Sequence, residues 1–141
     1  MLMLDAAAIA ARIPHAGPMS LLDGVLDWTE THIVCQATSH RRLDNPMVQD
    51  GRLDAICGIE YAGQAMALHG ALTAETATPR KGYLANVRSV VCAVPRLDDL
   101  PEPLRIEAHR LMGEAGRVIY RFAITCNDMP IVSGQAAVVI A

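Results

Sequence analysis

The chain has few aromatic residues and a small net charge. Each of these shortages excludes some kinds of core or some classes of protein. Phe, Trp and Tyr make up 4% of its 141 residues while 52% are hydrophobic, so aliphatic side chains and Met must form the core. The net charge of −3 argues against general binding to nucleic acid. At this length we expect one domain, residues 1–141, with enough interior for a real core.

Closely spaced cysteines are also missing. Cys35, Cys57, Cys92 and Cys126 lie far apart, and none belongs to a C-x-x-C pair. Each sits in an apolar or alternating run, so we expect buried free thiols rather than disulfides or zinc ligands. Free thiols are typical of cytoplasmic proteins. The sequence indicates no metal and no redox cofactor.

Long apolar runs are absent as well. The first 13 residues are apolar, but Asp5 and Arg12 interrupt them and the basic start of a signal peptide is lacking. No stretch reaches the roughly 18 uncharged apolar residues of a membrane span. We therefore expect a cytoplasmic protein without a membrane partner.

The most informative segment that is present covers residues 51–73. It reads as one long helix, apolar on almost every side, with the carboxylate of Glu60 near its middle. Such a helix is normally buried, and a carboxylate in it is costly unless it is paired, protonated or used. Burial raises the pKa of a carboxyl group, which suits it to acid or base work. Glu60 is therefore a candidate catalytic residue, and a structural partnership with a buried amide or an arginine is the alternative.

The rest of the chain reads mostly as strands. Residues 5–11 are Ala-rich with Asp5 as a possible cap, which predicts a short helix. Alternating or β-branched runs predict strands at residues 21–28, 32–38, 82–94, 104–112, 117–126 and 131–140. This order predicts an α+β domain in which an antiparallel sheet of about six strands wraps one long helix.

Two motifs resemble those of a known family. Residues 13–23, Ile-Pro-His-Ala-Gly-Pro-Met-Ser-Leu-Leu-Asp, are similar to the N-terminal motif of bacterial 3-hydroxyacyl-acyl-carrier-protein dehydratases. Residues 58–65, Gly-Ile-Glu-Tyr-Ala-Gly-Gln-Ala, resemble their helix motif. The likeness is greatest to the dehydratase-like proteins of aryl polyene pigment clusters and covers essentially the whole chain. It implies the hot-dog fold, lyase activity in fatty acid or polyene biosynthesis, and a dimer.

One position departs from the family pattern. The standard dehydratases carry a catalytic His in a His-Phe-Pro-Gly loop, 14 residues before the helix Glu, and that position here is Pro46. The nearest histidine on that side is His40. In the family, the His and the Glu come from opposite subunits. The resemblance therefore implies that this chain supplies Glu60 to a homodimer or to a heterodimer with a His-bearing partner.

The chemistry then defines the candidate site. Dehydration needs a base for the Cα proton and an acid for the leaving hydroxyl, for which Glu60 and His15 are the candidates. Amides at the start of the helix suit the developing enolate oxygen. We expect substrate contacts from Ala55, Ile56, Gly58, Tyr61 and Gln64.

Several of these residues have plainer alternatives. His15 lies in a Pro/Gly loop, where fixing the loop is the alternative to acting as a base. Gln64, one turn after Glu60, either orients that carboxylate or satisfies a backbone group. Tyr61 is expected to line the core or an acyl tunnel. His69, near the helix end, is expected to face away from Glu60, packed or in solvent.

The resemblance also implies an acyl carrier protein as partner. Carrier proteins are acidic, so docking needs a basic patch, and ordinary solvated surface is the alternative for each basic residue. The candidates are Arg41, Arg42, Arg80, Lys81 and Arg88. Two other functions stay open. One is a hot-dog thioesterase whose helix carboxylate activates water, and the other is a non-catalytic acyl-binding subunit, which Pro46 favours.

Overall fold

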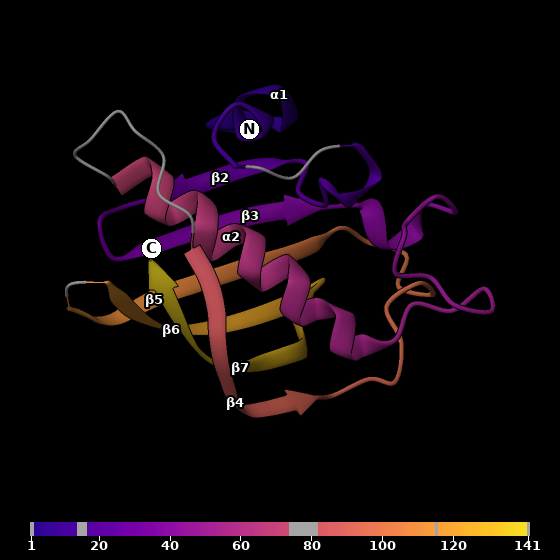
Figure 1. Cartoon of the computed structure of the whole chain (residues 1–141). Helices are drawn as coiled ribbons and strands as arrows, with labels where there is room; N and C mark the ends of the chain where they lie inside the picture. Colours follow the sequence, from indigo (N-terminus) through magenta and orange to yellow (C-terminus); the bar gives the residue numbers. More distant parts are fainter. Residues whose placement is uncertain (1, 14–16, 74–81, 115, 141) are drawn as a thin grey trace.

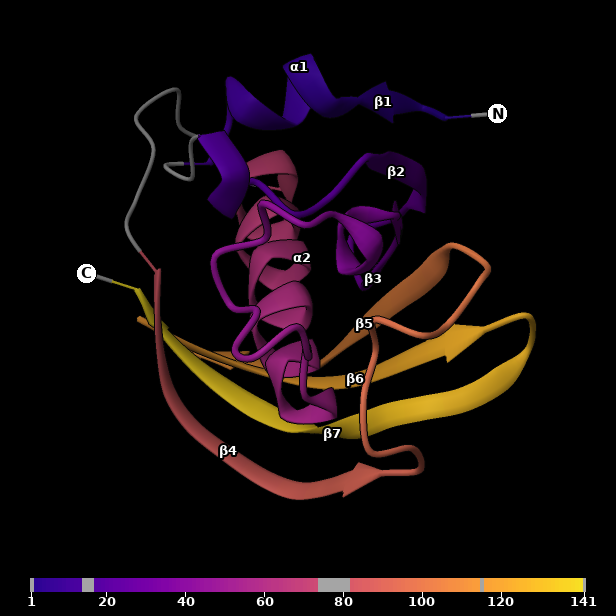
Figure 2. The ribbon, with the colours of Figure 1, turned by 90° about the vertical axis from the view of Figure 1, so that its right-hand side faces the viewer.

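The computed structural model describes residues 2–13, 17–73, 82–114 and 116–140. One long helix, α2 (Gly58–Thr73), lies against one face of a seven-stranded antiparallel sheet (Figure 1). In the view turned by 90°, the sheet curves around this helix (Figure 2). The predicted α+β architecture, a central helix wrapped by an antiparallel sheet, is confirmed.

The strands follow the predicted runs closely. They are β1 (Leu4–Asp5), β2 (Gly24–Trp28), β3 (His32–Ala37), β4 (Gly82–Cys92), β5 (Leu104–Glu114), β6 (Arg117–Cys126) and β7 (Met129–Ile140). Their order in the sheet is β1-β2-β3-β5-β6-β7-β4, so β4, which follows the helix in sequence, forms one edge. All six predicted strands are present. The seventh, β1, has two residues and therefore shows no alternation in the sequence.

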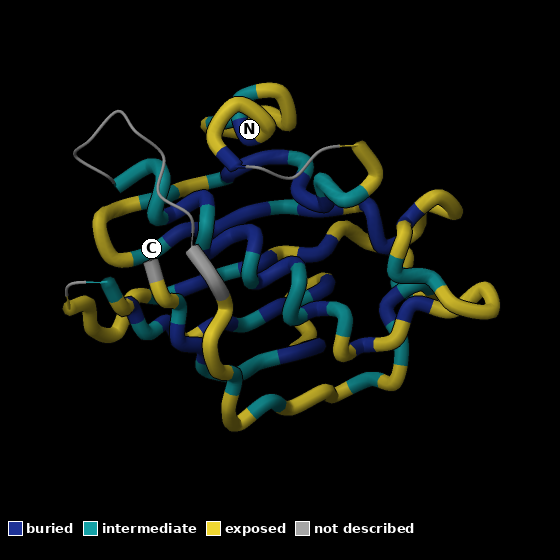
Figure 3. The backbone as a smooth tube through the Cα atoms, in the orientation of Figure 1, coloured by how far each residue is buried: buried dark blue, intermediate teal, exposed yellow. Residues whose placement is uncertain are grey.

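Alternation along the strands directs one face of the sheet toward α2. In β6, Tyr120, Phe122 and Ile124 are buried, whereas Arg121 between them is exposed. The buried residues form one continuous core between helix and sheet, dark blue in Figure 3. Aliphatic side chains supply most of it, as the low aromatic content predicts. No residue of α2, all of which the structure describes, is classed as exposed.

The helix begins later than the sequence predicts. Asp50 and Gly51 both have positive φ values, 53° and 71°, and Gln49 and Arg52 exchange backbone hydrogen bonds across them. This is the tight reversal that Asp-Gly favours. Leu53 then accepts a hydrogen bond from the Leu97 amide at 2.8 Å, and a 3-10 turn at Ala55–Cys57 leads into α2. The expected helix start at residue 51 is therefore wrong, because a turn and an extended segment precede it.

The N-terminal helix and the cysteines mostly match expectation. Helix α1 (Ala6–Ala10) is capped by Asp5, whose Oδ1 accepts a hydrogen bond from the Ala8 amide at 2.9 Å. All four cysteines are free thiols, as predicted. Cys35 is buried, and burial raises the pKa of its thiol to about 12. Cys92 is exposed, however, which corrects the expectation that every cysteine is buried.

Candidate active site

Glu60 is the third residue of α2 and is half-buried rather than enclosed by the core. The side chain of Gln64 lies one turn later on the same face of the helix. Its Nε2 is 3.4 Å from Glu60 Oε1, so the amide donates a hydrogen bond to the carboxylate. The structure therefore shows the pairing that the four-residue spacing indicates.

Gln64 also anchors the segment before β2. Its Nε2 donates to the Met19 carbonyl at 2.7 Å, and its Oε1 accepts from the Leu21 amide at 3.0 Å. Both alternatives considered for Gln64 therefore hold, because one amide contacts the carboxylate and satisfies two backbone groups. With 1% of its surface exposed, Gln64 is fixed between helix and loop.

Tyr61 lies in the core rather than on an accessible wall. It has no exposed surface, and its hydroxyl is 2.7 Å from Ser39 Oγ and accepts a hydrogen bond from Asn45 Nδ2 at 3.2 Å. Ser39 Oγ in turn donates to the Leu21 carbonyl at 2.8 Å. Burial raises the pKa of the Tyr61 phenol, so it stays neutral. Tyr61 joins α2 to the loop that precedes it.

The position that matches the usual catalytic His is in that same loop. Pro46 is exposed, and its neighbour Asn45 is buried. Asn45 Nδ2 also donates to the Ser39 carbonyl at 3.0 Å, and Asn45 Oδ1 accepts from the Met47 amide at 3.0 Å. The loop is therefore held in a defined conformation that presents Pro46 instead of a base.

The backbone before α2 is held by the segment 95–98. The Leu53 amide donates to Asp98 Oδ1 at 2.9 Å, and the Arg96 guanidinium pairs with the same carboxylate, which holds the Asp98 pKa well below its usual range. The Ala55 amide donates to the Pro95 carbonyl at 3.2 Å. Ala55 is buried and its N–H has a protein partner, so in this structure its amide is not free to bind an enolate oxygen.

The remaining predicted substrate contacts are Gly58, which packs against the sheet, and Ile56, which is accessible. A Cβ placed on Gly58 would lie 3.1 Å from atoms of Ile124 and Val132, so this glycine allows α2 to approach the sheet rather than an acyl chain. A Cβ on Gly63 would meet no described atom within 4 Å. Ile56 is 53% exposed. Residues 56, 60 and 63 are spaced by a helical turn, so the accessible side of the helix start carries Glu60.

Two of the histidines considered from the sequence, His40 and His69, are buried. His15 lies outside the described residues. His40 is buried with Nε2 3.0 Å from the Leu100 carbonyl, and burial lowers its pKa. His69 is also buried, and its two ring nitrogens contact the Tyr120 hydroxyl at 2.7 Å and the Thr29 carbonyl at 2.8 Å. His69 is therefore packed, and the solvent-facing alternative is wrong.

Of the basic residues predicted to meet a carrier protein, the structure describes Arg41, Arg42 and Arg88. Arg41 donates to the Pro101 carbonyl at 2.8 Å, and Arg42 donates to the Pro18 carbonyl at 3.1 Å. Both therefore lie near the loops around α2. Arg88 is on β4, and the pair at positions 80 and 81 lies outside the described residues.

Sequence reasoning missed the residues that position the site. Asn45, Ser39 and Asp98 hold the loops around Glu60 through the hydrogen bonds given above. Asn before Pro46 is a turn signal that marks the loop, but no pattern reveals that its side chain turns inward to Tyr61. Among the residues that the structure describes, no three or more His, Cys, Asp or Glu side chains are grouped to hold a metal ion. Within the same residues, no helix is long and apolar enough to cross a membrane.

One long helix wrapped by an antiparallel sheet is the arrangement of a hot-dog protein. The family model described as ApeP-like, ApeP dehydratase, matches residues 7–141. The chain belongs to this ApeP-like dehydratase family. No curated protein sequence matches the chain significantly.

Solved structures agree with this assignment. The dehydratase heterocomplex ApeI:P from Xenorhabdus doucetiae is similar with a TM-score of 0.79 and 26% identity, covering 94% of this chain and 90% of that chain. A thioesterase from Silicibacter sp. TM1040, described as putative, has a TM-score of 0.67 at 11% identity and covers 100% and 94% of the two chains. A hypothetical thioesterase with coenzyme A from Streptococcus pneumoniae has a TM-score of 0.61 at 11% identity, covering 83% and 84%. The two thioesterases share the fold alone.

Proposed function

We propose that this chain is one subunit of a dehydratase that removes water from 3-hydroxyacyl thioesters on an acyl carrier protein. The observation that carries the proposal is the pairing of Glu60 with Gln64 on the accessible side of α2, beside a loop that presents Pro46. The chain has a positioned carboxylate, while the loop position of the usual base holds a residue that cannot take a proton. A second hot-dog subunit then supplies the base.

In the proposed reaction, a histidine of the partner takes the Cα proton of the substrate. The electron pair of the C–H bond forms the Cα=Cβ double bond, and the bond between Cβ and the hydroxyl oxygen breaks. Protonated Glu60 gives its proton to that oxygen, which leaves as water. The proton on the histidine returns to Glu60 through solvent, so the acid and the base are both restored.

Gln64 is the positioning residue in this scheme. Its amide fixes Glu60 against the backbone of Met19 and Leu21, so the carboxyl group has a defined place relative to the loop. Ile56 is the remaining candidate donor for the enolate oxygen, because the Ala55 amide is already bonded to Pro95. Because Gly63 has no side chain, the substrate or the partner can approach the helix closely at that position.

The likeness to a dehydratase heterocomplex supports a heterodimer as the working unit. The carrier protein meets the molecule on the side of Arg41 and Arg42, which donate to carbonyls of the segments before β5 and β2. The free thiols support a cytoplasmic reaction.

The test is an intact-mass measurement on a 3-hydroxyacyl carrier protein. It uses this chain alone, the His-bearing subunit from the same locus alone, and the two together. We expect loss of one water to be fastest with both subunits and absent with this chain alone. Water loss by this chain alone would contradict the paired site, and release of the acyl group would identify a thioesterase instead.

A further inference from the structure

A row of hydrogen-bond donors crosses the outer face of the sheet, opposite α2. Residues at directly paired positions on five strands form it, and we call it the donor row. His32 pairs with His109, His109 with Arg121, Arg121 with Gln135 and Gln135 with Arg88. With strands about 4.8 Å apart, the row spans roughly 19 Å.

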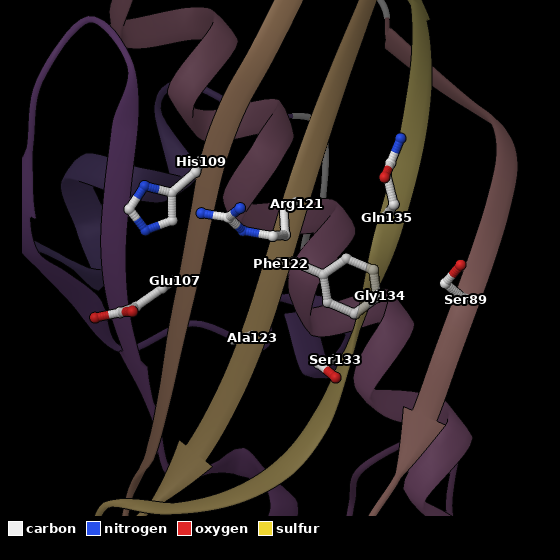
Figure 4. Close-up of a pocket in the computed structure, with 9 residues that line it drawn as sticks. All are labelled: Ser89, Glu107, His109, Arg121, Phe122, Ala123, Ser133, Gly134 and Gln135. Atoms are coloured by element: carbon white, nitrogen blue, oxygen red, sulfur yellow. The ribbon is translucent and has the colours of Figure 1, made fainter.

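The row lies over a hollow. A cavity of about 410 Å³ is lined by His109, Arg121 and Gln135, with Ser133 and Gly134 among the small residues of its floor. Figure 4 shows the Arg121 guanidinium extending toward His109, with α2 behind the strands. Gln135 also lines a second hollow.

The positive charge of this face is not balanced. Glu107, which lines the first hollow, pairs with Arg105 at 3.1 Å, and Asp27 pairs with His32 at 3.5 Å. Arg88 and Arg121 are exposed, and no carboxylate among the described residues forms an ion pair with either. Arg121 and Arg88 are the cross-strand neighbours of Gln135 on either side, in a chain whose net charge is −3.

A third guanidinium adjoins them. Arg117 lines the second hollow together with Arg88 and Gln135. Its cross-strand neighbour is Glu114, and the two form no ion pair among the described contacts. The unbalanced charge thus extends over both hollows.

We propose that this face binds a small ligand carrying two or more phosphoryl groups. Guanidinium groups bind phosphoryl oxygens through two parallel hydrogen bonds. Arg121 lines the first hollow and Arg88 the second, and Gln135, a neutral donor, lines both. The cavity has the volume of a small-molecule site. Arg88 and Arg121 are two strands apart, roughly 10 Å at the backbone, so two phosphoryl groups on one ligand match them.

This site is separate from the proposed dehydration. Arg121 lies between Tyr120 and Phe122, which face the core, so its side chain points away from α2 and Glu60. A carrier protein that delivers its cargo to Glu60 therefore has no need of this face. The site is tested by binding alone, so its failure and the failure of the proposed function are distinguishable.

The experiment is calorimetric titration of the whole chain, alone and with its partner subunit, with sodium tripolyphosphate at fixed ionic strength. We expect saturable binding that Arg121→Gln and Arg88→Gln each weaken roughly tenfold, because each removes a charge-assisted hydrogen-bond pair. Arg12→Gln is the matched control, because Arg12 is an exposed arginine that lines neither hollow, and it should weaken binding less than about twofold.

Thermal unfolding of each variant shows that it is folded. Equal loss of binding in all three variants, or no saturation beyond what sodium chloride produces, would overturn the proposal. So would binding of a hexaglutamate peptide in place of tripolyphosphate, which would mark a protein-docking surface. A change of oligomeric state in Arg121→Gln, measured by light scattering, would overturn it in favour of an interface between copies.

Discussion

Gln64 joins Glu60 to the loop before β2. Its amide nitrogen lies 3.4 Å from Glu60 Oε1 and 2.7 Å from the Met19 carbonyl oxygen. Its oxygen accepts from the Leu21 amide at 3.0 Å. A single side chain thus fixes where the carboxyl group lies relative to the loop.

Replacing Gln64 with Leu should lower both stability and turnover. The change leaves the buried Leu21 amide and Met19 carbonyl without partners, which costs about 2–5 kcal/mol in the free energy of unfolding. Urea denaturation followed by circular dichroism measures this. Gln49→Leu, at an exposed position, is the control and should shift the value by less than about 0.5 kcal/mol. Equal effects of the two substitutions would show that the Gln64 bonds do not hold the loop.

Replacing Tyr61 with Phe should loosen the loop that contains Pro46. The Tyr61 hydroxyl contacts Ser39 and Asn45, so its removal costs about 1–3 kcal/mol and speeds amide hydrogen exchange at residues 39–47. Tyr120→Phe is the matched control, because it removes a hydroxyl bonded to His69 and leaves this loop alone. The same exchange rates in both variants would contradict the assigned role of Tyr61.

Stability should fall in mild acid because of two buried histidines. Burial lowers the folded-state pKa of His40 and His69 below the ordinary value of 6.5. Above pH 6.5 both histidines are neutral in the folded and in the unfolded chain, so the free energy of unfolding has its full value. Below it the unfolded chain binds protons that the folded chain does not, so stability declines as pH falls.

Urea unfolding at pH 7.5 and 5.5 measures that decline. His69→Gln should show a smaller difference between the two pH values than the wild-type chain, whatever its stability at pH 7.5. Gln49→Leu, which removes no titratable group, is the control and should keep the full difference. If the free energy of unfolding falls equally between the two pH values in His69→Gln and in the wild-type chain, His69 does not cause the fall.

The fold is readable from the sequence to a large extent, because its elements follow simple periodicities. β6 alternates cleanly over its ten residues and β5 over its first six, and α2 is apolar enough to be recognised as central. The start of α2 is misplaced because an apolar stretch after Asp50 and Gly51 reads as helix, whereas those two residues adopt a turn. Turn chemistry overrides hydrophobicity at that point.

The site is less readable than the fold, because it depends on contacts between distant residues. Glu60 and Gln64 are four residues apart, so helix geometry alone predicts their contact. The hydrogen bonds of Gln64 to Met19 and Leu21 span 45 and 43 residues, and no local pattern encodes them. The burial of His69 is not predictable from local sequence either, because its hydrogen-bond partner Tyr120 is 51 residues away.

The central claim is that Glu60 supplies the acid for a base in another subunit. The most direct measurement is single-turnover dehydration of a 3-hydroxyacyl carrier protein by the reconstituted pair, with Glu60→Gln in this chain and Glu30→Gln, at an exposed site, as the control. We predict that Glu60→Gln leaves assembly and folding intact and slows water loss by roughly 10²–10⁴-fold, as expected when a general acid is removed. A rate within about twofold of the wild-type pair would contradict the claim, because an acid that carries the reaction must contribute more than that.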